Sequence, residues 1–371
     1  MNSRSSEGKR GLDPEWYLSP EVFDFEKQNI FETCWVPIGY ESQWPEVGSF
    51  QRQKILDCEC VVVRDKENRI RVFENVCRHR GTQLCHDADG QLNSAFACPY
   101  HGWKYDFDGK LISAPNMQNV QGFAWDEFGL KELQCVSWQG FLFAGRSPAS
   151  SPPAEKLAGV LDCFDLENYQ VQQSITYDVA ANWKLFFQNY NECYHCPSVH
   201  PQLTPYSDYR DSENEFEAGD VLGGPMRIRD VVETISSDGK FCGQPAKSLP
   251  ESELKNARYL TVFPNLFVSV FPDYVMIHRL TPIDLGRTQI ECEFLFHSDT
   301  IQSAGFDSRK ASEFWDLTNR QDWEMCERVQ VGLTTPGFQP SPYSNLESLL
   351  VEFDEYYLEQ MKRSGYPSLN P

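Results

Sequence analysis

The pattern of hydrophobic and polar positions divides the first 146 residues into a short helical start and a β-rich stretch. Ser19 and Pro20 favour the N-cap and first position of an amphipathic helix that would run to about residue 34. Beyond it, short runs of β-favouring residues alternate with turn signals, and the segment 106–110 is typical of a hairpin turn. We therefore predict a compact all-β domain, whose clearest strand runs are 60–64, 70–73 and 139–145.

The pattern changes after a Pro- and Ser-rich linker at 147–153. It predicts a strand at 169–179 and a helix from residue 183 to about 194. The stretch 205–256 is polar, acidic and rich in Gly and Ser, and we expect a lid or an insert without regular structure there.

The C-terminal part alternates strands and helices. Three strong strand runs are predicted at 259–271, 274–280 and 288–297. A long helix follows at 308–333, and a final amphipathic helix carries Leu346, Leu350, Phe353 and Tyr357 at helical spacing. This order predicts an α+β domain with a curved antiparallel sheet wrapped on a long helix.

Composition narrows the classes of function. The formal charge of −21 argues against nucleic acid or an anionic membrane as a partner. The chain has no apolar run of about eighteen residues and a polar N-terminus without a secretory signal, so we expect a cytoplasmic protein without membrane contact. Thirteen cysteines, several of them single in apolar surroundings, then indicate reduced thiols and metal ligands in preference to a disulfide framework.

Two tight turns in the β-rich stretch each combine one Cys with one His. Cys77 and His79 have the spacing C-x-H, and Cys98 and His101 have the spacing C-x-x-H. A structural zinc site would usually group like ligands together, although zinc and ordinary core residues remain alternatives. This mixed pattern suits a [2Fe–2S] cluster in which two thiolates bind one iron and two imidazoles bind the other.

A second group of candidate ligands lies in the stretch Asn189–Pro201. His195 and His200 are five residues apart, which would place them about 140° from each other on a regular helix. Pro197 should end the helix and let His200 turn back toward the same metal. Two imidazoles that leave positions open suit a non-haem Fe(II) site with two His and one carboxylate.

Two acidic residues are candidates for that carboxylate. Glu192 lies three residues before His195, on one helix face. Asp322 lies in the middle of the apolar stripe of the helix 308–333, where either a metal partner or a solvated boundary position would account for it.

The motifs and their order resemble the catalytic (α) subunits of Rieske non-haem iron oxygenases over nearly the whole chain. Gly102–Asp106 with Gly109 is similar to the hairpin of the Rieske domain, and Trp183–Pro201 is similar to the mononuclear-iron segment. The resemblance implies an N-terminal segment 1–34 that packs with the catalytic domain, a Rieske domain 35–146 and a helix-grip catalytic domain 147–371.

The resemblance also implies roles for individual residues. It makes His195, His200 and Asp322 the iron ligands, and Asn189 and Glu192 catalytic residues. Glu192 would link the His195 of one subunit to His101 of the partner subunit, in a homotrimer. Most family members have Asp at this position, and the version Asn-Glu-Cys-Tyr-His-Cys resembles monooxygenases that act on quaternary ammonium compounds such as carnitine and glycine betaine.

The implied reaction is the reductive activation of O2 and the hydroxylation of a small organic substrate. Electrons from NAD(P)H would come through a separate flavin or iron–sulfur reductase, or a ferredoxin, because the chain has no G-x-G-x-x-G fingerprint. A quaternary ammonium substrate of the betaine, carnitine or choline type would undergo hydroxylation or N-demethylation, and an aromatic ring is the alternative substrate. A non-catalytic Rieske electron carrier is the alternative from another class.

A quaternary ammonium group binds best within an aromatic cage. The candidate pocket residues are Tyr190, Phe263, Phe267, Phe271 and Tyr274, although aromatic residues in strands are also ordinary core residues. The acidic stretch 205–256 would favour a cationic substrate, unless its charges are only solvated.

Overall fold

The computed structural model describes residues 8–55, 57–149, 151–152 and 154–367. It divides into two compact units, one spanning Phe31–Pro152 and the other combining Met1–Ile30 with Pro153–Pro371. Among the described residues, no helix is both long enough and apolar enough to cross a membrane.

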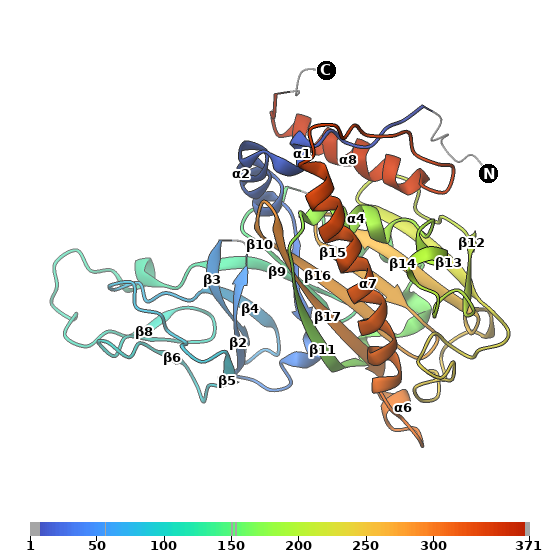
Figure 1. The fold of residues 1–371 in the computed structure, drawn as a ribbon. Coiled ribbons are helices and arrows are strands. Elements are labelled where there is room, and N and C mark those ends of the chain that lie inside the picture. Colours follow the sequence, from blue (N-terminus) through green and yellow to red (C-terminus); the bar gives the residue numbers. More distant parts are fainter. Residues whose placement is uncertain (1–7, 56, 150, 153, 368–371) are drawn as a thin grey trace. The chain divides into compact units, whose positions relative to one another are not determined.

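The unit Phe31–Pro152 consists mainly of antiparallel strands, as predicted (Figure 1). Its larger sheet has the strand order β1 (Val36–Tyr40), β10 (Phe141–Gly145), β9 (Glu132–Trp138), β4 (Ile70–Glu74), β3 (Cys58–Arg64), β2 (Ser49–Ile55) and β5 (Asp89–Gln91). A smaller sheet contains β6 (Phe96–Ala97), β7 (Lys104–Tyr105) and β8 (Leu111–Ser113). Short 3-10 turns lie at Phe31–Thr33, Glu41–Gln43 and Trp125–Phe128.

The internal strand β3 separates two hydrophobic clusters. Val61 and Val63 point into one cluster and Cys60 and Val62 into the other, because successive side chains of a strand face opposite sides of the sheet. The first cluster also contains Cys77, Cys98, Trp103 and Tyr105. The turns with the Cys–His pairs are therefore anchored in the core of this unit.

The second unit is built on one antiparallel sheet. Its strand order is β11 (Tyr169–Val179), β17 (Arg287–His297), β16 (Val275–Asp284), β15 (Leu266–Val270), β14 (Asn256–Val262), β13 (Val221–Ile228) and β12 (Ser207–Ser212). Figure 1 shows the long helix α7 (Arg309–Leu333) running across this sheet. The predicted α+β arrangement of a curled sheet and a long helix is confirmed.

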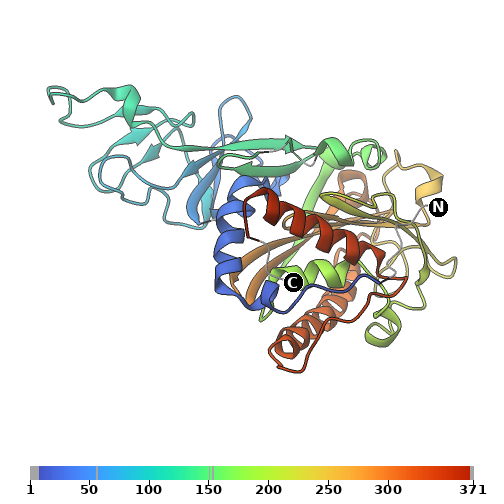
Figure 2. The same cartoon turned by 90° about the horizontal axis from the view of Figure 1, so that it is seen from above.

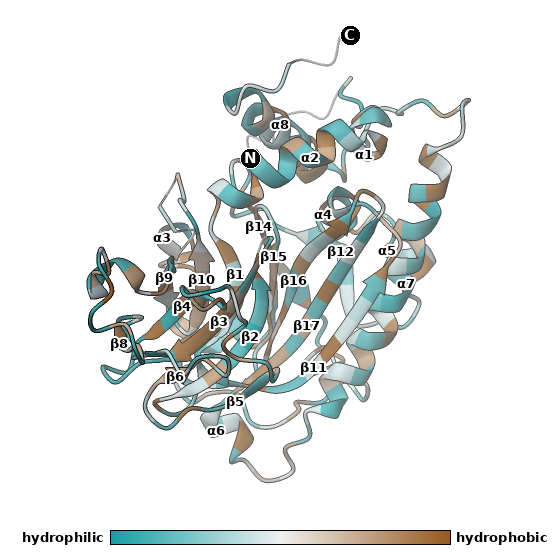
Figure 3. Cartoon of the chain, turned by 90° about the vertical axis from the view of Figure 1, so that its left-hand side faces the viewer, coloured by the Kyte–Doolittle hydropathy of each residue, from teal (hydrophilic) through white to brown (hydrophobic). Residues whose placement is uncertain are grey.

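Seven shorter helices complete the described part of this unit. They are α1 (Glu15–Leu18), α2 (Pro20–Asn29), α3 (Ala154–Leu157), α4 (Trp183–Tyr190), α5 (Cys196–Val199), α6 (Ser298–Ile301) and α8 (Ser348–Arg363), with 3-10 turns at Asp162–Phe164, Leu166–Asn168 and Glu251–Glu253. Hydrophobic and hydrophilic residues alternate along α7 in Figure 3, as expected for a helix with one buried face. The predicted helix start is confirmed, since the Ser19 hydroxyl accepts a hydrogen bond from the Val22 N–H.

A fully buried carboxylate connects the N-terminal helix to the rest of this unit. Glu26 of α2 accepts hydrogen bonds from Lys184 Nζ at 2.5 Å, from the Tyr357 hydroxyl at 2.5 Å and from Trp183 Nε1 at 2.9 Å. Its charge is paired and all of its partners are buried, which offsets the cost of removing it from water. Figure 2 shows α2 (blue) beside α8 (dark red), the helix that carries Tyr357.

Two predictions about this sheet are wrong. The stretch 205–256 is not irregular, because it contains β12 and β13. Gly223 and Gly224 suggested a loop, but they allow close strand packing: a Cβ on Gly223 would lie 2.0 Å from the Tyr259 carbonyl oxygen. The predicted run 259–271 is two strands, since Pro264 lacks an N–H and lies in the turn between them.

Candidate metal centres and active-site cavity

The two Cys–His turns of the β-rich unit have the same backbone closure. The Gly81 N–H donates to the Cys77 carbonyl at 3.0 Å, and the Gly102 N–H donates to the Cys98 carbonyl at 3.1 Å. Both glycines have positive φ angles, +75° and +71°, which a residue with a Cβ rarely adopts. Each turn can therefore fold back on itself and direct its Cys and His toward the same point.

The side chains of these turns fit a [2Fe–2S] cluster. The rings of His79 and His101 are 4.6 Å apart between centroids, and Cys77 and Cys98 are buried. His79 stacks on Trp103, and its Nδ1 atom is buried without a hydrogen-bond partner among the described residues. A buried ring nitrogen without a partner is costly, and an iron ligand position would remove that cost.

Tyr105 supports the Cys77 turn from within the core. Its hydroxyl accepts a hydrogen bond from the Arg78 N–H at 3.0 Å, and it lies 3.3 Å from Cys77 Sγ. The hydroxyl proton is thus free to point at the sulfur. A hydrogen bond to a cluster sulfur is one of the factors that set a cluster's reduction potential.

In the other unit, α4 and α5 position the two candidate iron-binding histidines. The Asn182 side chain caps α4 by accepting a hydrogen bond from the Lys184 N–H at 3.1 Å. The helix ends at Tyr190, earlier than predicted, and Pro197 lies in the first turn of α5 instead of breaking a helix. The first turn tolerates proline because its N–H has no helical acceptor.

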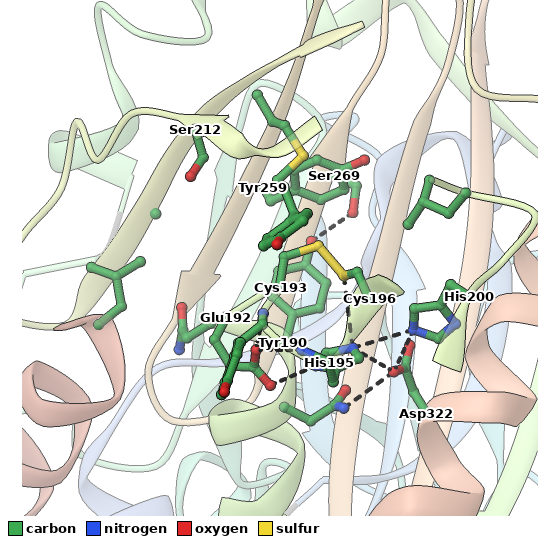
Figure 4. A pocket seen from close by; sticks show the side chains of 18 of the residues that line it. Tyr190, Glu192, Cys193, His195, Cys196, His200, Ser212, Tyr259, Ser269 and Asp322 are labelled. Carbon is green, nitrogen blue, oxygen red and sulfur yellow. Dashed lines mark hydrogen bonds and ion pairs between the residues drawn. A yellow bond between two sulfur atoms is a disulfide. The ribbon is translucent and has the colours of Figure 1, made fainter. Parts of the chain in front are cut away.

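The turn between these helices and the middle of α7 bring three donor atoms together (Figure 4). Nε2 of His195 lies 3.2 Å from Nε2 of His200 and 3.2 Å from Oδ1 of Asp322. Nε2 of His200 lies 2.9 Å from the same carboxylate oxygen. Two imidazole nitrogens and a carboxylate oxygen that converge in this way are the donor set of a 2-His-1-carboxylate iron site.

Side chains outside this triangle fix the orientation of each donor. Nδ1 of His195 donates to Glu192 at 2.5 Å, and Nδ1 of His200 donates to Gln321 Oε1 at 2.8 Å. Asn189 Nδ2 donates to Oδ1 of Asp322 at 3.1 Å. Since a ring nitrogen that donates outward leaves the other with a free lone pair, both Nε2 atoms are prepared to bind a metal.

The charges of the three donors depend on one another. Burial lowers the pKa of His195, but hydrogen bonds to Asp322 and Glu192 outweigh burial and raise it to about 10. Burial likewise raises the pKa of Asp322, but hydrogen bonds from His195 and His200 outweigh it and lower the pKa to about 2. A cation at the centre of the triangle would replace the imidazolium proton in neutralising the carboxylate.

A cavity of about 340 Å³ opens onto these donors. Its aromatic wall consists of Tyr190, Tyr194, Tyr209, Tyr259, Trp315 and Trp323. Of the five predicted pocket residues only Tyr190 lines it. The prediction is corrected for Phe263, Phe267, Phe271 and Tyr274, which are buried in the core and do not line the cavity. Phe267 lies on the same face of β15 as Ser269, but it stacks on the ring of Tyr190, with centroids 4.5 Å apart, and Tyr190, Tyr259 and Ser269 line the cavity.

The expectation of reduced cysteines is wrong at one place. Cys193 and Cys196 form a disulfide beside His195, and both line the cavity (Figure 4). The eleven other cysteines, all of which lie among the described residues, form no disulfide. Spacing alone could not show this bond, because it depends on the chain turning after Tyr190.

The sequence also contained residues whose roles were missed. Gln321, the contact of His200, precedes Asp322 but looks like any polar residue of a solvated helix face. Trp315 and Trp323 of α7 carry the helical spacing of a core stripe, and Tyr209 lies in the stretch expected to be irregular. Only the fold shows that these side chains surround one space.

Comparison with known proteins agrees with this geometry. Residues 34–124 match the Rieske [2Fe–2S] domain, and residues 166–363 match the catalytic domain of the ring hydroxylating alpha subunit. The chain belongs to the Rieske non-haem iron oxygenases. It is therefore an oxidoreductase, with a Rieske cluster in one unit and non-haem iron in the other. The family resemblance that the sequence motifs indicated is confirmed.

Several relatives of this Rieske oxygenase are named after quaternary ammonium compounds. It is 30% identical to the glycine betaine monooxygenase oxygenase subunit of Chromohalobacter salexigens, over 96% of this chain and 87% of the relative. It is 32% identical to the carnitine monooxygenase oxygenase subunit of Escherichia coli (strain K12), over 88% and 85%. It is 26% identical to the chloroplastic choline monooxygenase of Arabidopsis thaliana, over 91% and 80%.

Solved structures share the fold of this Rieske oxygenase. The quaternary ammonium Rieske monooxygenase CntA, in complex with an inhibitor, matches with a TM-score of 0.80 at 21% identity, over 95% of each chain. Naphthalene 1,2-dioxygenase from Rhodococcus sp. matches with a TM-score of 0.77 at 21% identity, over 95% of this chain and 94% of the other.

Proposed function

We propose that this terminal oxygenase component hydroxylates a small quaternary ammonium compound of the betaine or carnitine type, with His195, His200 and Asp322 as iron ligands. The observation that carries the proposal is the cavity at these three donors, whose wall is rich in aromatic faces. The names of the glycine betaine, carnitine and choline relatives support it.

The aromatic wall suits a cation without hydrogen-bond donors. A trimethylammonium group cannot donate a hydrogen bond, so its hydration is best replaced by the negative faces of aromatic rings. Trp315 and Tyr259 lie 6.3 Å apart between ring centroids, and Tyr190 and Tyr259 are also 6.3 Å apart. Tyr259 thus lies between the two other rings in the cavity wall, and the three rings would contact the methyl groups.

Arg210 would recognise the other end of such a substrate. It lines the cavity from β12, with its guanidinium 5.0 Å from the ring of Tyr209. The described residues show no carboxylate paired with it, so it is available for the carboxylate of a betaine or carnitine. This residue would favour zwitterionic substrates over choline, which has no carboxylate.

The residues around the metal donors would act by holding protons and orientations. Glu192 and Gln321 would keep the protons of His195 and His200 on Nδ1, and Asn189 would hold the Asp322 carboxylate in place. Iron on the three donors would supply the activation of O2, with electrons delivered by the Rieske cluster.

We infer that electrons come from NAD(P)H through a separate flavin or iron–sulfur reductase. We also infer a homotrimer in which Glu192 connects His195 to His101 of the partner subunit. The 2.5 Å hydrogen bond between Glu192 and His195 supports this, because Glu192 also lines the cavity, is partly exposed and retains acceptor capacity.

Aromatic-ring hydroxylation is the second candidate. The same wall could stack a planar ring, and the naphthalene dioxygenase fold is similar. A non-catalytic electron carrier is disfavoured because such a protein has no need of the converged donors of His195, His200 and Asp322.

Substrate-dependent O2 uptake with a surrogate reductase tests the proposal. Glycine betaine, carnitine, choline and simple arenes are compared, each cation against its neutral tert-butyl isostere. We expect uptake with a zwitterionic quaternary ammonium compound and at least tenfold less with its isostere. Arg210→Leu should raise KM for the carboxylate substrates and leave choline unaffected. Uptake with arenes alone would refute the substrate class.

A further inference from the structure

The disulfide between Cys193 and Cys196 encloses a metal-binding residue. His195 lies within the four-residue segment that the bond closes, and Cys196 is buried. Sγ of Cys196 is 3.9 Å from Nε2 of His195, the atom that faces His200 and Asp322. Figure 4 shows the sulfur pair between Tyr259 and His195.

The donor atoms of His195, Cys196 and His200 all lie within 4.8 Å of one another. Donor atoms on the same tetrahedral zinc site lie roughly 3.5 Å apart, given bonds of about 2.0–2.3 Å. Asp322 Oδ1 lies on the same centre, at 3.2 Å from His195 and 2.9 Å from His200. The donors of His195, Cys196 and His200 are thus close enough to share one ion after small shifts, and Asp322 already contacts both imidazoles.

The disulfide decides how many of these donors can act. Thiolate is a strong metal ligand, whereas a sulfur held in a disulfide carries no charge and binds metals weakly. With the bond closed, the site offers two imidazoles and a carboxylate. With the bond open, it offers a thiolate as well.

We propose that reduction of the Cys193–Cys196 disulfide converts the three-donor iron site into a four-donor His195–Cys196–His200–Asp322 site that prefers Zn²⁺. The inference rests on the proposed ligand set. A dithiol reductant would give two electrons and two protons to the disulfide, leave two thiols on the chain and become a disulfide itself. Cys196 then releases its proton to solvent when it binds the ion.

The change in donor set alters which metal is favoured. Zinc prefers a closed tetrahedral set of nitrogen and sulfur donors, whereas non-haem Fe(II) sites of two His and one carboxylate keep positions open for O2 and substrate. Zinc has no redox chemistry, so a zinc-loaded site could not turn over. The activity of the enzyme would then depend on whether its surroundings keep the Cys193–Cys196 disulfide oxidised or reduce it.

Cys193 and Cys196 have different parts in this proposal. Cys193 is absent from the group of donor atoms and acts only as the bonding partner of Cys196. Cys193→Ser should therefore leave the thiol of Cys196 permanently available. Cys196→Ser removes the sulfur donor and should leave the three-donor site in any redox state.

Cobalt(II) binding to the full chain, with its cluster retained and its mononuclear metal removed by chelation, tests the proposal. Wild type is compared before and after dithiothreitol, which is removed anaerobically by gel filtration. Difference spectra with and without cobalt cancel the cluster absorbance. We expect sulfur-to-cobalt charge transfer in the near ultraviolet for reduced wild type and Cys193→Ser, and none for oxidised wild type or Cys196→Ser.

Zinc competition against cobalt gives a second measurement. Zinc should bind Cys193→Ser at least tenfold more tightly than Cys196→Ser. If reduced wild type and Cys193→Ser bound cobalt without a sulfur-to-cobalt band, the four-donor site would be refuted, but the three-donor ligand set would stand. The same would follow if wild type gained no thiols on reduction. Failure of all variants to bind cobalt would overturn the ligand set of the proposed function as well.

Discussion

Glu192 and His195 form a hydrogen bond of 2.5 Å on the side of the imidazole that faces away from His200 and Asp322. The same carboxylate also accepts the backbone N–H groups of Tyr194 and His195, so it is held in the turn that it orients. This position allows Glu192 to act on the metal site without binding the metal.

Glu192→Gln should separate metal binding from electron transfer. The amide oxygen can still accept the Nδ1 proton of His195, so we expect both metals to remain, with cobalt affinity within about tenfold of wild type. If the charge of Glu192 couples the two sites of neighbouring subunits, substrate-dependent O2 uptake should fall at least tenfold. Turnover at the wild-type rate would remove Glu192 from the electron path.

Gln321→Leu should weaken the metal site from the other side. The change removes the acceptor of the His200 Nδ1 proton, and such outer contacts are typically worth about 10–100-fold in metal affinity. Gln321→Glu, which keeps an acceptor at the same place, is the matched control and should restore most of the affinity. Calorimetric titration with cobalt checks this, and equal affinities for both variants would contradict it.

Tyr105→Phe should lower the reduction potential of the Rieske cluster. It removes the hydroxyl that lies 3.3 Å from Cys77 Sγ and leaves the aromatic core packing in place. A hydrogen bond worth about 1 kcal/mol more to the reduced cluster corresponds to roughly 40 mV for one electron. A spectroscopic redox titration measures this, and an unchanged potential would show that the hydroxyl does not reach the sulfur.

Asp354→Asn should change the pH dependence of stability. Burial raises the pKa of Asp354 to about 7, against the hydrogen bonds from Tyr343 and Gln188 that lower it. Between about pH 4 and 7 the folded state holds a proton there that the unfolded state has lost. This group's contribution to stability therefore falls as pH rises, by about 1.4 kcal/mol per pH unit.

The difference in unfolding free energy between wild type and Asp354→Asn isolates that contribution. It should decline across the window from about pH 4 to 7 and level off above it. Asp178→Asn, an exposed change in the same unit, should give a difference without this decline. A flat difference for Asp354→Asn would show that the carboxyl is already ionised in the folded protein.

Sequence patterns predicted much of the fold because apolar residues recur at the spacing of a helix or of a strand in each unit. The apolar stripe of α7 and the Ser19-Pro20 helix start were visible in the order of residues. Polarity and glycine concealed β12 and β13, since Gly223 and Gly224 are present for close strand contact and resemble loop residues. The pattern of apolar residues indicates which side of a helix or strand is buried. It does not indicate how closely a neighbouring strand approaches the backbone.

The candidate site was partly predictable for a related reason. The motifs and the family resemblance identified His195, His200 and Asp322 as candidate ligands. The structure places their donor atoms within 3.2 Å of one another. The Gln321 contact, the Cys193–Cys196 bond and the aromatic wall depend on how α4, α5 and α7 approach each other. No local spacing encodes that approach.

The central claim is that the chain holds a Rieske cluster and a separate iron bound by His195, His200 and Asp322. The iron and acid-labile sulfide contents of wild type and Asp322→Ala test it most directly. We expect about three irons and two sulfides per chain in wild type, two irons and both sulfides in the cluster and one iron in the other unit. Asp322→Ala should contain about two irons and two sulfides, with an unchanged visible spectrum. A third iron retained in that variant, or zinc without visible charge-transfer bands in wild type, would contradict the account.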